Sequence, residues 1–312
     1  MVSDSLDVQQ RPTEAGDFES RPPIFVLGID RSGTSMVSEL LFRWGAHAGA
    51  QDLLCAADEG NPQGYWEYQP MQAFFTELMN SAGVSIWDPE LSQAMRRQVS
   101  DPELRRRAME LAAEMGAPDR PWFWKDSQLI FSLPFLREVF PSAVYLITLR
   151  NPYDSAVSYE KLRIPAPLQN KVRLIGYTLL RWQHLMVSIC EELKSYPRKL
   201  LVSYEALVSS PREQCARICR FLDAAYGPAD DSEVRAERMA QSINPNLWRN
   251  DSQVPFAERR NVSQAQRDLF LYLSSRLDGD VSDFDAARYP FPEWSREYCS
   301  NMSVMQWLLG SL

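Results

Sequence analysis

The sequence predicts an α/β fold: a three-layer domain with a central, mostly parallel sheet covered by helices on both faces. Two observations support this. Short apolar runs alternate along the chain with segments in which apolar residues recur at helical spacing. Turns rich in glycine or polar residues separate the runs from those segments. Alternating strands and helices imply right-handed crossovers and therefore parallel pairing.

The first strand is predicted from Pro23 to Gly28, written PIFVLG. It is a continuous apolar run that ends in glycine, as expected for a strand buried on both faces. Apolar residues then recur at helical spacing from Met36 to Trp44. The segment therefore reads as a strand, a glycine-containing turn and a helix.

Two further strands are predicted before residue 150. Trp122 to Trp124 is a short apolar run that ends at Lys125, and Ala143 to Leu149 is a longer one. The second run is followed by RNP and then by a segment with Asp154 near its start, which suits the first turn of a helix. The stretch from Leu53 to Pro70 is crowded with turn-forming and aromatic residues and is expected to be a loop over the sheet edge.

The second half continues the same alternation. Apolar residues from Leu168 to Leu193 alternate steps of four and three, which predicts a long helix with one buried stripe. Lys199 to Tyr204 reads as a strand, and Pro211 opens a helix with Cys215 and further apolar residues on one side. We expect residues 23–312 to form a single domain and residues 1–22, which are polar and acidic, to be a disordered tail.

Composition and charge exclude several classes of function. A net charge of −8 argues against a protein that coats nucleic acid or an anionic membrane, so an anionic ligand would be held by a few well-placed groups. No apolar run is long enough to span a bilayer. Five cysteines without CxxC spacing, and the absence of a secretion signal, predict free thiols in the cytoplasm. The oligomeric state cannot be read from the sequence.

The carboxyl ends of parallel strands meet at one edge of the sheet, where ligands bind. Residues at or just beyond these predicted ends are Arg31, Lys125, Arg150 and Tyr204. This convergence predicts the position of the site.

The loop GIDRSGTS has its two glycines five residues apart, as in the GxxxxGK[ST] phosphate-binding motif. Thr34 stands where that motif has lysine. A nucleoside triphosphatase needs this lysine on its phosphates, so hydrolysis of nucleotides is disfavoured. Arg31 supplies a cation from a different position in the turn. Further along, Arg150 and Ser158 straddle the start of a helix, where a guanidinium, a hydroxyl and free N–H groups can surround a phosphate.

Together these segments resemble the sulfotransferase superfamily, whose donor is 3′-phosphoadenosine 5′-phosphosulfate. GIDRSGTS resembles the family's phosphosulfate loop, with Arg31 where cytosolic members carry lysine and tyrosylprotein and many bacterial members carry arginine. LRNPYDSAVSYEKLR resembles its 3′-phosphate motif, and NPQGYWEYQP followed by WKD resembles bacterial members. The resemblance runs from about Pro23 to Asp223.

The resemblance implies a set of donor-binding residues and no metal. Its P-loop-like phosphosulfate loop would contribute Arg31, Ser32, Gly33, Thr34 and Ser35. The 3′-phosphate would be held by Arg150 and Ser158, and Tyr204 would reach the adenine. Loss of the sulfuryl group would leave 3′,5′-adenosine bisphosphate as the product of the donor. Because sulfuryl transfer resembles phosphoryl transfer in requiring positioning and charge stabilisation, cations already in place would replace a metal.

The resemblance also implies two cations and a base for the chemical step. Lys125 is expected near the departing bridge oxygen, with Arg31 on the phosphosulfate. The chain departs from the family pattern in three places: KDS replaces KDP, the histidine base of cytosolic members has no counterpart, and the late RKGxxG motif is absent. The arginine-type members use a glutamate as base, which points to Glu67 in GYWEY, with Glu59 and Asp126 as alternatives.

The predicted reaction is in-line transfer of a sulfuryl group to a hydroxyl, or less favourably an amine, of a small molecule, a glycan or a lipid. Eight aromatic residues are expected partly to line an acceptor pocket suited to an apolar or aromatic alcohol and partly to fill the core: Tyr65, Trp66, Tyr68, Phe74, Phe75, Trp87, Trp122 and Trp124. Two alternatives are open. One is a P-loop-type kinase or nucleoside triphosphatase; the other is a non-catalytic nucleotide-binding protein on the same fold.

Overall fold

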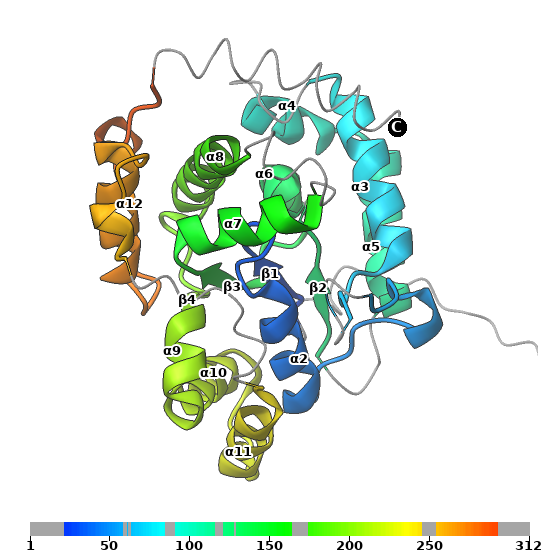
Figure 1. The fold of residues 1–312 in the computed structure, drawn as a ribbon. Helices are drawn as coiled ribbons and strands as arrows, with labels where there is room; N and C mark the ends of the chain where they lie inside the picture. Colours follow the sequence, from blue (N-terminus) through cyan, green and yellow to red (C-terminus); the bar gives the residue numbers. More distant parts are fainter. Residues whose placement is uncertain are drawn as a thin grey trace, which may run out of the picture.

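The computed structural model describes residues 22–58, 61, 64–84, 91–115, 121–127, 129–163, 174–244 and 254–292. Four parallel strands form the central sheet in the order β2-β1-β3-β4 (Figure 1). They are β1 (Ile24–Leu27), β2 (Phe123–Lys125), β3 (Val144–Leu149) and β4 (Lys199–Ser203). The predicted α/β fold with a parallel sheet is confirmed, and all four strands lie within one or two residues of their predicted positions.

Helices cover both faces of the sheet, and their bounds are α2 (Thr34–Trp44), α3 (Gln69–Ala82), α4 (Leu91–Gln98), α5 (Pro102–Met115), α6 (Leu129–Val139), α7 (Pro152–Arg163), α8 (Ile175–Leu193), α9 (Tyr204–Ser209), α10 (Pro211–Tyr226), α11 (Ser232–Ser242) and α12 (Gln264–Ser274). Short 3-10 turns occupy Gln51–Leu53, Phe256–Glu258 and Ala286–Arg288. The start of the helix predicted from Leu168 lies outside the described residues, as do residues 1–21 of the predicted tail and residues 293–312.

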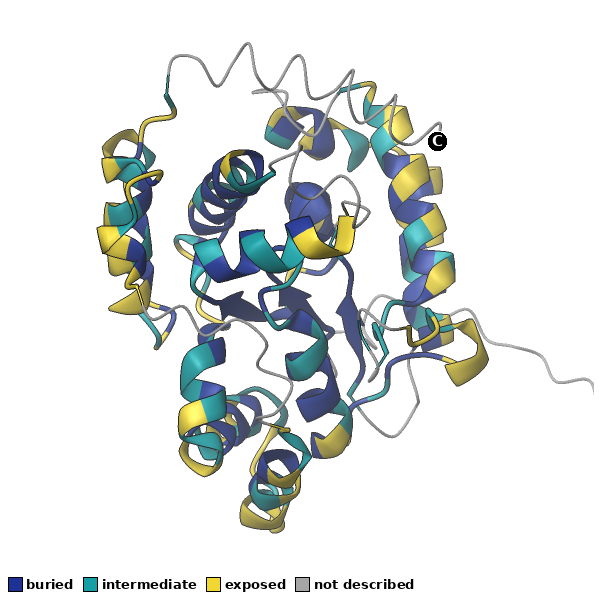
Figure 2. Ribbon diagram, viewed as in Figure 1, coloured by how far each residue is buried: buried dark blue, intermediate teal, exposed yellow. Residues whose placement is uncertain are grey.

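Alternate side chains of each strand pack into two separate hydrophobic cores, one on each face of the sheet, as the period-two geometry of a strand requires. Ile24 and Val26 of β1 face a layer made by α2, α9, α10 and α11. Phe25 and Leu27 face the other layer, which includes α3 to α6, α8 and α12. The strands are buried except at Ser203, the half-buried last residue of β4, while the outer faces of the helices are exposed (Figure 2). That residues 23–312 form one domain stays a prediction.

The strand order places a switch point at β1. From β1 the chain passes to β2 on one side, and then returns to β3 on the other. In a doubly wound sheet, ligands bind outside the carboxyl ends of the strands where this reversal occurs. Lys125 ends β2, and Arg150 directly follows β3. The topology therefore gathers the predicted residues at one place.

Candidate active site

A cavity of about 550 Å³ opens at this switch point. Its walls come from the loop after β1, the start of α2, the loop before α3 and the first turn of α3, the ends of β2 and β3, helix α7, the start of α9 and the end of α11. All but one of the residues predicted for the site line it: Arg31, Gly33, Thr34, Ser35, Glu67, Lys125, Arg150, Ser158 and Tyr204. Ser32 is the predicted site residue that the lining lacks.

Ser32 lies inside the protein, and its predicted role as a ligand donor is not supported. The side chain is 2% exposed. Its hydroxyl donates to the carbonyl of Ile29 (2.7 Å) and lies 2.6 Å from the hydroxyl of Thr148 on β3. Its backbone N–H also bonds the Ile29 carbonyl, at 3.1 Å. Ser32 therefore closes the turn, because its donors are used within the protein.

The loop is packed tightly onto β3. A Cβ added to Gly28 would lie 1.9 Å from Thr148 Oγ1, closer than any real side chain approaches another atom. Thr148 also contacts the Leu27 carbonyl, at 3.2 Å. Gly28 is therefore needed so that the loop can approach β3, and Thr148 and Ser32 then fix its shape.

The start of α2 is suited to an anion. Gly33 precedes the helix in a left-handed conformation (φ 98°), and no described side chain caps this end or adds an acid to its first turn. N-terminal N–H groups left without helical partners carry a partial positive charge that attracts phosphate or sulfate. The structure thus gives the loop the local geometry that GxxxxG spacing predicts.

The segment predicted to bind the 3′-phosphate, with Arg150 and Ser158, contacts this loop directly. Arg150 donates from Nη1 to the backbone carbonyl of Arg31 (2.8 Å), and Arg31 donates from Nε to Ser158 Oγ (3.1 Å). The Arg150 guanidinium lies over the ring of Tyr204, 4.3 Å from its centroid. Stacking of this kind holds a guanidinium in place. The two motifs, more than 110 residues apart in sequence, therefore form one cationic wall.

Tyr204 differs in one respect from its prediction as the end of a strand. It is the first residue of α9, directly after β4. Its ring packs on the phosphate-type loop so closely that a Cβ on Gly33 would lie 2.5 Å from Tyr204 Cδ2. Ser203 caps α9 by accepting from Ala206 N, which fixes where the helix begins.

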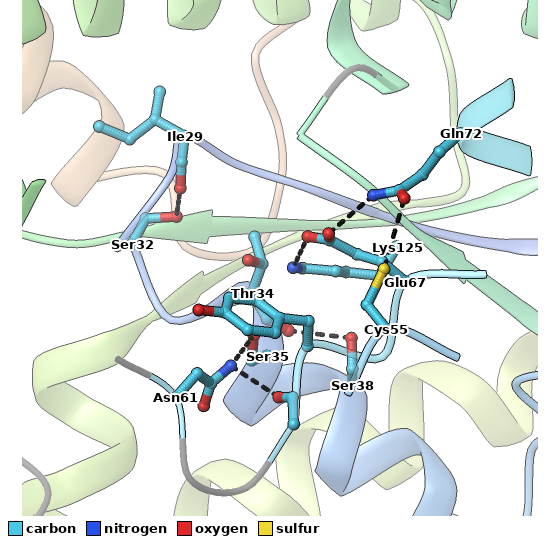
Figure 3. Close-up of polar contacts among 12 residues, drawn as sticks. Ile29, Ser32, Thr34, Ser35, Ser38, Cys55, Asn61, Glu67, Gln72 and Lys125 are labelled. Atoms are coloured by element: carbon cyan, nitrogen blue, oxygen red, sulfur yellow. Dashed lines mark hydrogen bonds and ion pairs between the residues drawn. The ribbon is translucent and has the colours of Figure 1, made fainter. Parts of the chain in front are cut away.

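Glu67 and Lys125 form an ion pair on the other side of the cavity (Figure 3). The Lys125 side chain is 6% exposed and that of Glu67 is 16% exposed. Gln72 of α3 donates to the second oxygen of Glu67, at 2.9 Å. A buried ion pair is costly to desolvate and is a poor means of gaining stability, so its position in a cavity favours a functional role.

Backbone strain occurs at this cavity. Within the part of the chain that the structure describes, the non-glycine residues with positive φ are Arg31 (68°) and Trp66 (60°). Arg31 belongs to the loop, and Trp66 directly precedes Glu67. The left-handed conformation is a genuine outlier for a bulky residue, and such outliers cluster at functional sites. The Trp66 ring packs against Phe42, with centroids 5.0 Å apart, and this contact helps to hold the strained turn.

A second ion pair lies under the loop. Asp30 lines the cavity and is bonded by Arg181 of α8, with 2.6 Å between Nη1 and Oδ2. Burial raises the pKa of Asp30, but the positive charges of Arg181, Lys125 and Arg163 outweigh it, so the pKa lies below its ordinary value. Asp30 is therefore ionised at neutral pH and ties the loop to α8.

The other candidate bases and most of the aromatic residues lie elsewhere. Glu59 and Trp87 fall outside the described residues. Asp126 is 5% exposed and does not line the cavity. Tyr65 lines the cavity, and five of the others belong to the part of the set that fills the core: Tyr68, Phe74, Phe75, Trp122 and Trp124. Trp66 packs on Phe42 and Phe123. Large aromatic side chains gain most from core burial.

Several lining residues, such as Asn61 and Asp58, were not predicted from the sequence, and Tyr65 has a polar partner that the sequence did not indicate. Asn61 donates to Ser35 Oγ (3.0 Å) and to the Gly64 carbonyl (2.6 Å). Tyr65 donates to Asp58, and burial together with this bond raises the pKa of Tyr65 to about 12. Ser242 to Asn244, at the end of α11, close another side. The turn signals around NPQGYWE indicate a loop, but they do not indicate which of its polar groups face inward.

Taken together, the cavity can hold an anion with two charged ends and can remove a proton beside it. Arg31, Arg150 and the start of α2 supply positive potential along one wall. Lys125 supplies a further cation next to a carboxylate. Within the described residues, there is no group of three or more His, Cys, Asp or Glu placed to hold a metal ion. The same part of the chain contains no helix that combines the length and the apolar character needed to cross a membrane.

Comparison with known proteins gives matches over most of the chain. The family model described as "Sulfotransferase family" matches residues 22–228. A Caenorhabditis briggsae protein named as a candidate protein-tyrosine sulfotransferase is 23% identical over 243 residues, covering 71% of this chain and 77% of that protein. Protein-tyrosine sulfotransferase 1 of Danio rerio is 24% identical over 217 residues, covering 67% of this chain and 55% of that protein. The chain thus spans about half the length of the second relative.

A solved structure is also similar: the sulfotransferase domain from the Synechococcus PCC 7002 olefin synthase. It is 19% identical and has a TM-score of 0.45, and the match covers 86% of this chain and 95% of that chain.

Proposed function

The chain belongs to the sulfotransferase family, and we propose that it transfers a sulfuryl group from 3′-phosphoadenosine 5′-phosphosulfate to a hydroxyl group by in-line displacement. Sulfuryl transfer to a hydroxyl is the reaction of the family. The identity of the donor, the residues that act and the nature of the acceptor are the parts that we propose.

One observation carries the proposal: the phosphate-type loop and the Glu67–Lys125 ion pair line the same cavity. The loop supplies what a phosphosulfate requires, namely an uncapped helix start and Arg31. The ion pair supplies a cation for the leaving group and a carboxylate for the incoming hydroxyl. Neither part alone distinguishes transfer from binding, whereas their juxtaposition favours transfer.

We assign roles to the donor-binding residues from this geometry. Arg31 and the N–H groups at the start of α2 hold the phosphosulfate, with the hydroxyls of Thr34 and Ser35. Arg150 and Ser158 hold the 3′-phosphate, and Tyr204 contacts the adenine. Arg150 is already oriented by the Arg31 carbonyl and the Tyr204 ring. Preorganised cations stabilise developing charge without the cost of reorganisation.

The chemical step uses Glu67 and Lys125. Glu67 takes the proton of the acceptor hydroxyl as the new O–S bond forms and the bond from sulfur to the bridging oxygen breaks. Lys125 stabilises the negative charge on the departing phosphate oxygen. The proton ends on Glu67, and the electron pair of the broken bond ends on the bisphosphate product.

The acceptor is proposed more broadly. We favour a hydroxyl of a small molecule, a glycan or a lipid, and the names of the two relatives add a protein tyrosine. The lining residues outside the cationic wall include several polar groups, such as Asp58, Tyr65, Gln72 and Ser127. They do not favour the apolar alcohol expected from the sequence.

A cytoplasmic location also stays a proposal. Four cysteines of the described chain are free thiols: Cys55, Cys190, Cys215 and Cys219. Free thiols are typical of a reducing compartment.

The test is donor binding followed by turnover. Calorimetry with 3′,5′-adenosine bisphosphate should give a tight, magnesium-independent complex, and incubation with the phosphosulfate donor and p-nitrophenol, a tyrosine peptide or a simple sugar should yield a sulfated product. Absence of bisphosphate binding would contradict the proposal. Binding without turnover on any acceptor, or on water, would favour the non-catalytic alternative. Magnesium-dependent hydrolysis of ATP would favour the kinase-like one.

A further inference from the structure

We propose that Gln72 is a positioning residue for Glu67: its side-chain amide, itself oriented by Cys55, holds the carboxylate so that one oxygen stays available for the acceptor proton. The inference rests on the proposed role of Glu67 as the base. Neither Gln72 nor Cys55 belongs to a motif by which the sequence resembles its family.

The two oxygens of Glu67 are held by different partners. Oε1 contacts Lys125 Nζ, and Oε2 accepts from Gln72 Nε2 at 2.9 Å (Figure 3). Lys125 extends from the sheet and Gln72 from the first turns of α3, so the carboxylate is fixed between two elements. A carboxylate bound on both oxygens has little freedom to rotate.

Only one of the two orientations of the Gln72 side-chain amide satisfies both of its partners. Cys55 donates from Sγ to Gln72 Oε1, at 3.3 Å. Burial raises the pKa of the Cys55 thiol, and the negative charges of Glu67 and Asp126 raise it further, so the sulfur keeps its proton and acts as a donor. With a donor on one side and a carboxylate on the other, the amide must present oxygen to Cys55 and nitrogen to Glu67.

The backbone holds the three residues together. Cys55 N–H bonds the Glu67 carbonyl at 2.8 Å, and Leu54 bridges to Tyr68. The Gln72 N–H bonds the Tyr68 carbonyl at 3.2 Å within the first turn of α3. The start of the loop, its end and the helix that follows therefore form one unit around the base.

This arrangement matters most during catalysis. Once Lys125 interacts with the bridging oxygen of the donor, its ion pair with Glu67 is weakened. The contact with Gln72 then fixes Oε2, which leaves Oε1 facing the cavity to accept the hydroxyl proton. Without Gln72 the carboxylate would follow the Lys125 cation. Because orientation of a reacting group has a large effect on rate, this contact should act on kcat.

The experiment compares Gln72→Met with Gln69→Met. Both change a glutamine of α3 to a residue of similar length. Gln69, however, is exposed, and the hydrogen bond from its side-chain amide to the Leu54 carbonyl is long (3.4 Å). The readout is release of bisphosphate from 3′-phosphoadenosine 5′-phosphosulfate, with phenol as acceptor, because its hydroxyl keeps its proton at neutral pH, and with water alone. Gln72→Met should lower kcat about ten- to a hundredfold, the range for a hydrogen bond to a charged group. The donor KM should change less than about twofold for both variants.

A double-mutant cycle separates positioning from a structural role. In a Glu67→Gln background, Gln72→Met should cause almost no further loss, because Gln72 acts through Glu67. Cys55→Ser, which keeps a donor, should stay closer to wild type than Cys55→Ala. A full additional loss in the Glu67→Gln background, or equal rates for Gln72→Met and Gln69→Met, would overturn the inference while leaving the proposed function intact. Wild-type protein that binds the donor without any turnover would instead overturn the proposed function, and the inference with it.

Discussion

The two sides of the cavity are built in different ways. The donor side is made of loops that directly follow buried strands, and its shape is set by backbone contacts and close packing, as at Gly28 and Gly33. The opposite side is made of side-chain contacts among Lys125, Glu67, Gln72 and Cys55, which come from a strand, a long loop and a helix. Donor binding thus depends on side chains such as Arg31 and Arg150 that the backbone of the loops holds in place, and the chemical step depends on a short series of side-chain contacts.

Because of this difference, substitutions on the two sides should affect different quantities, namely the rate of transfer on one side and donor affinity on the other. A change on the side of Glu67 should lower the rate and leave donor affinity in place. A change on the donor side should weaken binding or loosen the loop.

Glu67→Gln should give the largest effect. It removes the proposed base and keeps the size of the side chain, so kcat should fall by roughly 10²–10⁴, the range for loss of general acid–base catalysis. Binding of the bisphosphate, measured by calorimetry, should change little. Glu77→Gln, an exposed change on α3, is the matched control. Unchanged kcat in Glu67→Gln would remove Glu67 from the mechanism.

Arg150→Ala should weaken bisphosphate binding by roughly 2–5 kcal/mol, the range for truncating one partner of a buried charge contact. Arg150 also orients the loop through the Arg31 carbonyl, so the loss has two sources. Titration calorimetry measures it, with Arg212→Ala on the exposed surface as control. Wild-type affinity in the variant would place the 3′-phosphate elsewhere.

Asp30→Asn should lower the free energy of unfolding by about 2 kcal/mol at neutral pH, since it leaves the Arg181 guanidinium without its carboxylate partner. Because the pKa of Asp30 is lower in the folded than in the unfolded state, its contribution is present above pH ~4 and is lost as the pH falls through the folded-state value. Urea unfolding at neutral pH and at about pH 3 should therefore show the difference between wild type and variant shrink in acid.

Asp283→Asn, which removes an exposed partner of Arg276, serves as the control and should have a small effect at both pH values. A difference between wild type and Asp30→Asn that does not depend on pH would contradict the assignment.

Thr148→Val should give the smallest effect, about 1 kcal/mol in bisphosphate affinity. The change keeps the shape of the side chain but removes the hydroxyl that joins β3 to Ser32 and to the Leu27 carbonyl. Thr178→Val, a buried change at the start of α8, should affect stability alone. If both variants bind the bisphosphate like wild type, the Thr148 hydroxyl does not shape the loop.

Much of the fold followed from the sequence, and for one physical reason. Buried parallel strands are continuous apolar runs, so β1, β3 and β4 stand out, and residues just after them, such as Arg31 and Arg150, are placed with them. The spacing of Gly28 and Gly33 identifies a loop because a side chain at either position would clash.

The remainder depends on tertiary contacts that have no local signal. Nothing in a glutamine on α3 or a cysteine in a loop indicates that they meet at Glu67. Ser32 matched the motif, yet its hydroxyl bonds Ile29 and Thr148 instead of facing the cavity. Phe74 and Phe75 lie near the motif in sequence but pack in the core. An aromatic residue in a helix does not itself indicate whether its face lines a cavity or packs against other elements.

The central claim is that donor binding and proton removal meet in this one cavity. Its most direct test is bisphosphate release from 3′-phosphoadenosine 5′-phosphosulfate, measured for wild type and Glu67→Gln at saturating donor without added metal. Wild type should release bisphosphate together with a sulfated acceptor, and Glu67→Gln should bind the donor equally well and release almost none. Equal release by the two proteins, or loss of donor binding in the variant, would contradict the claim.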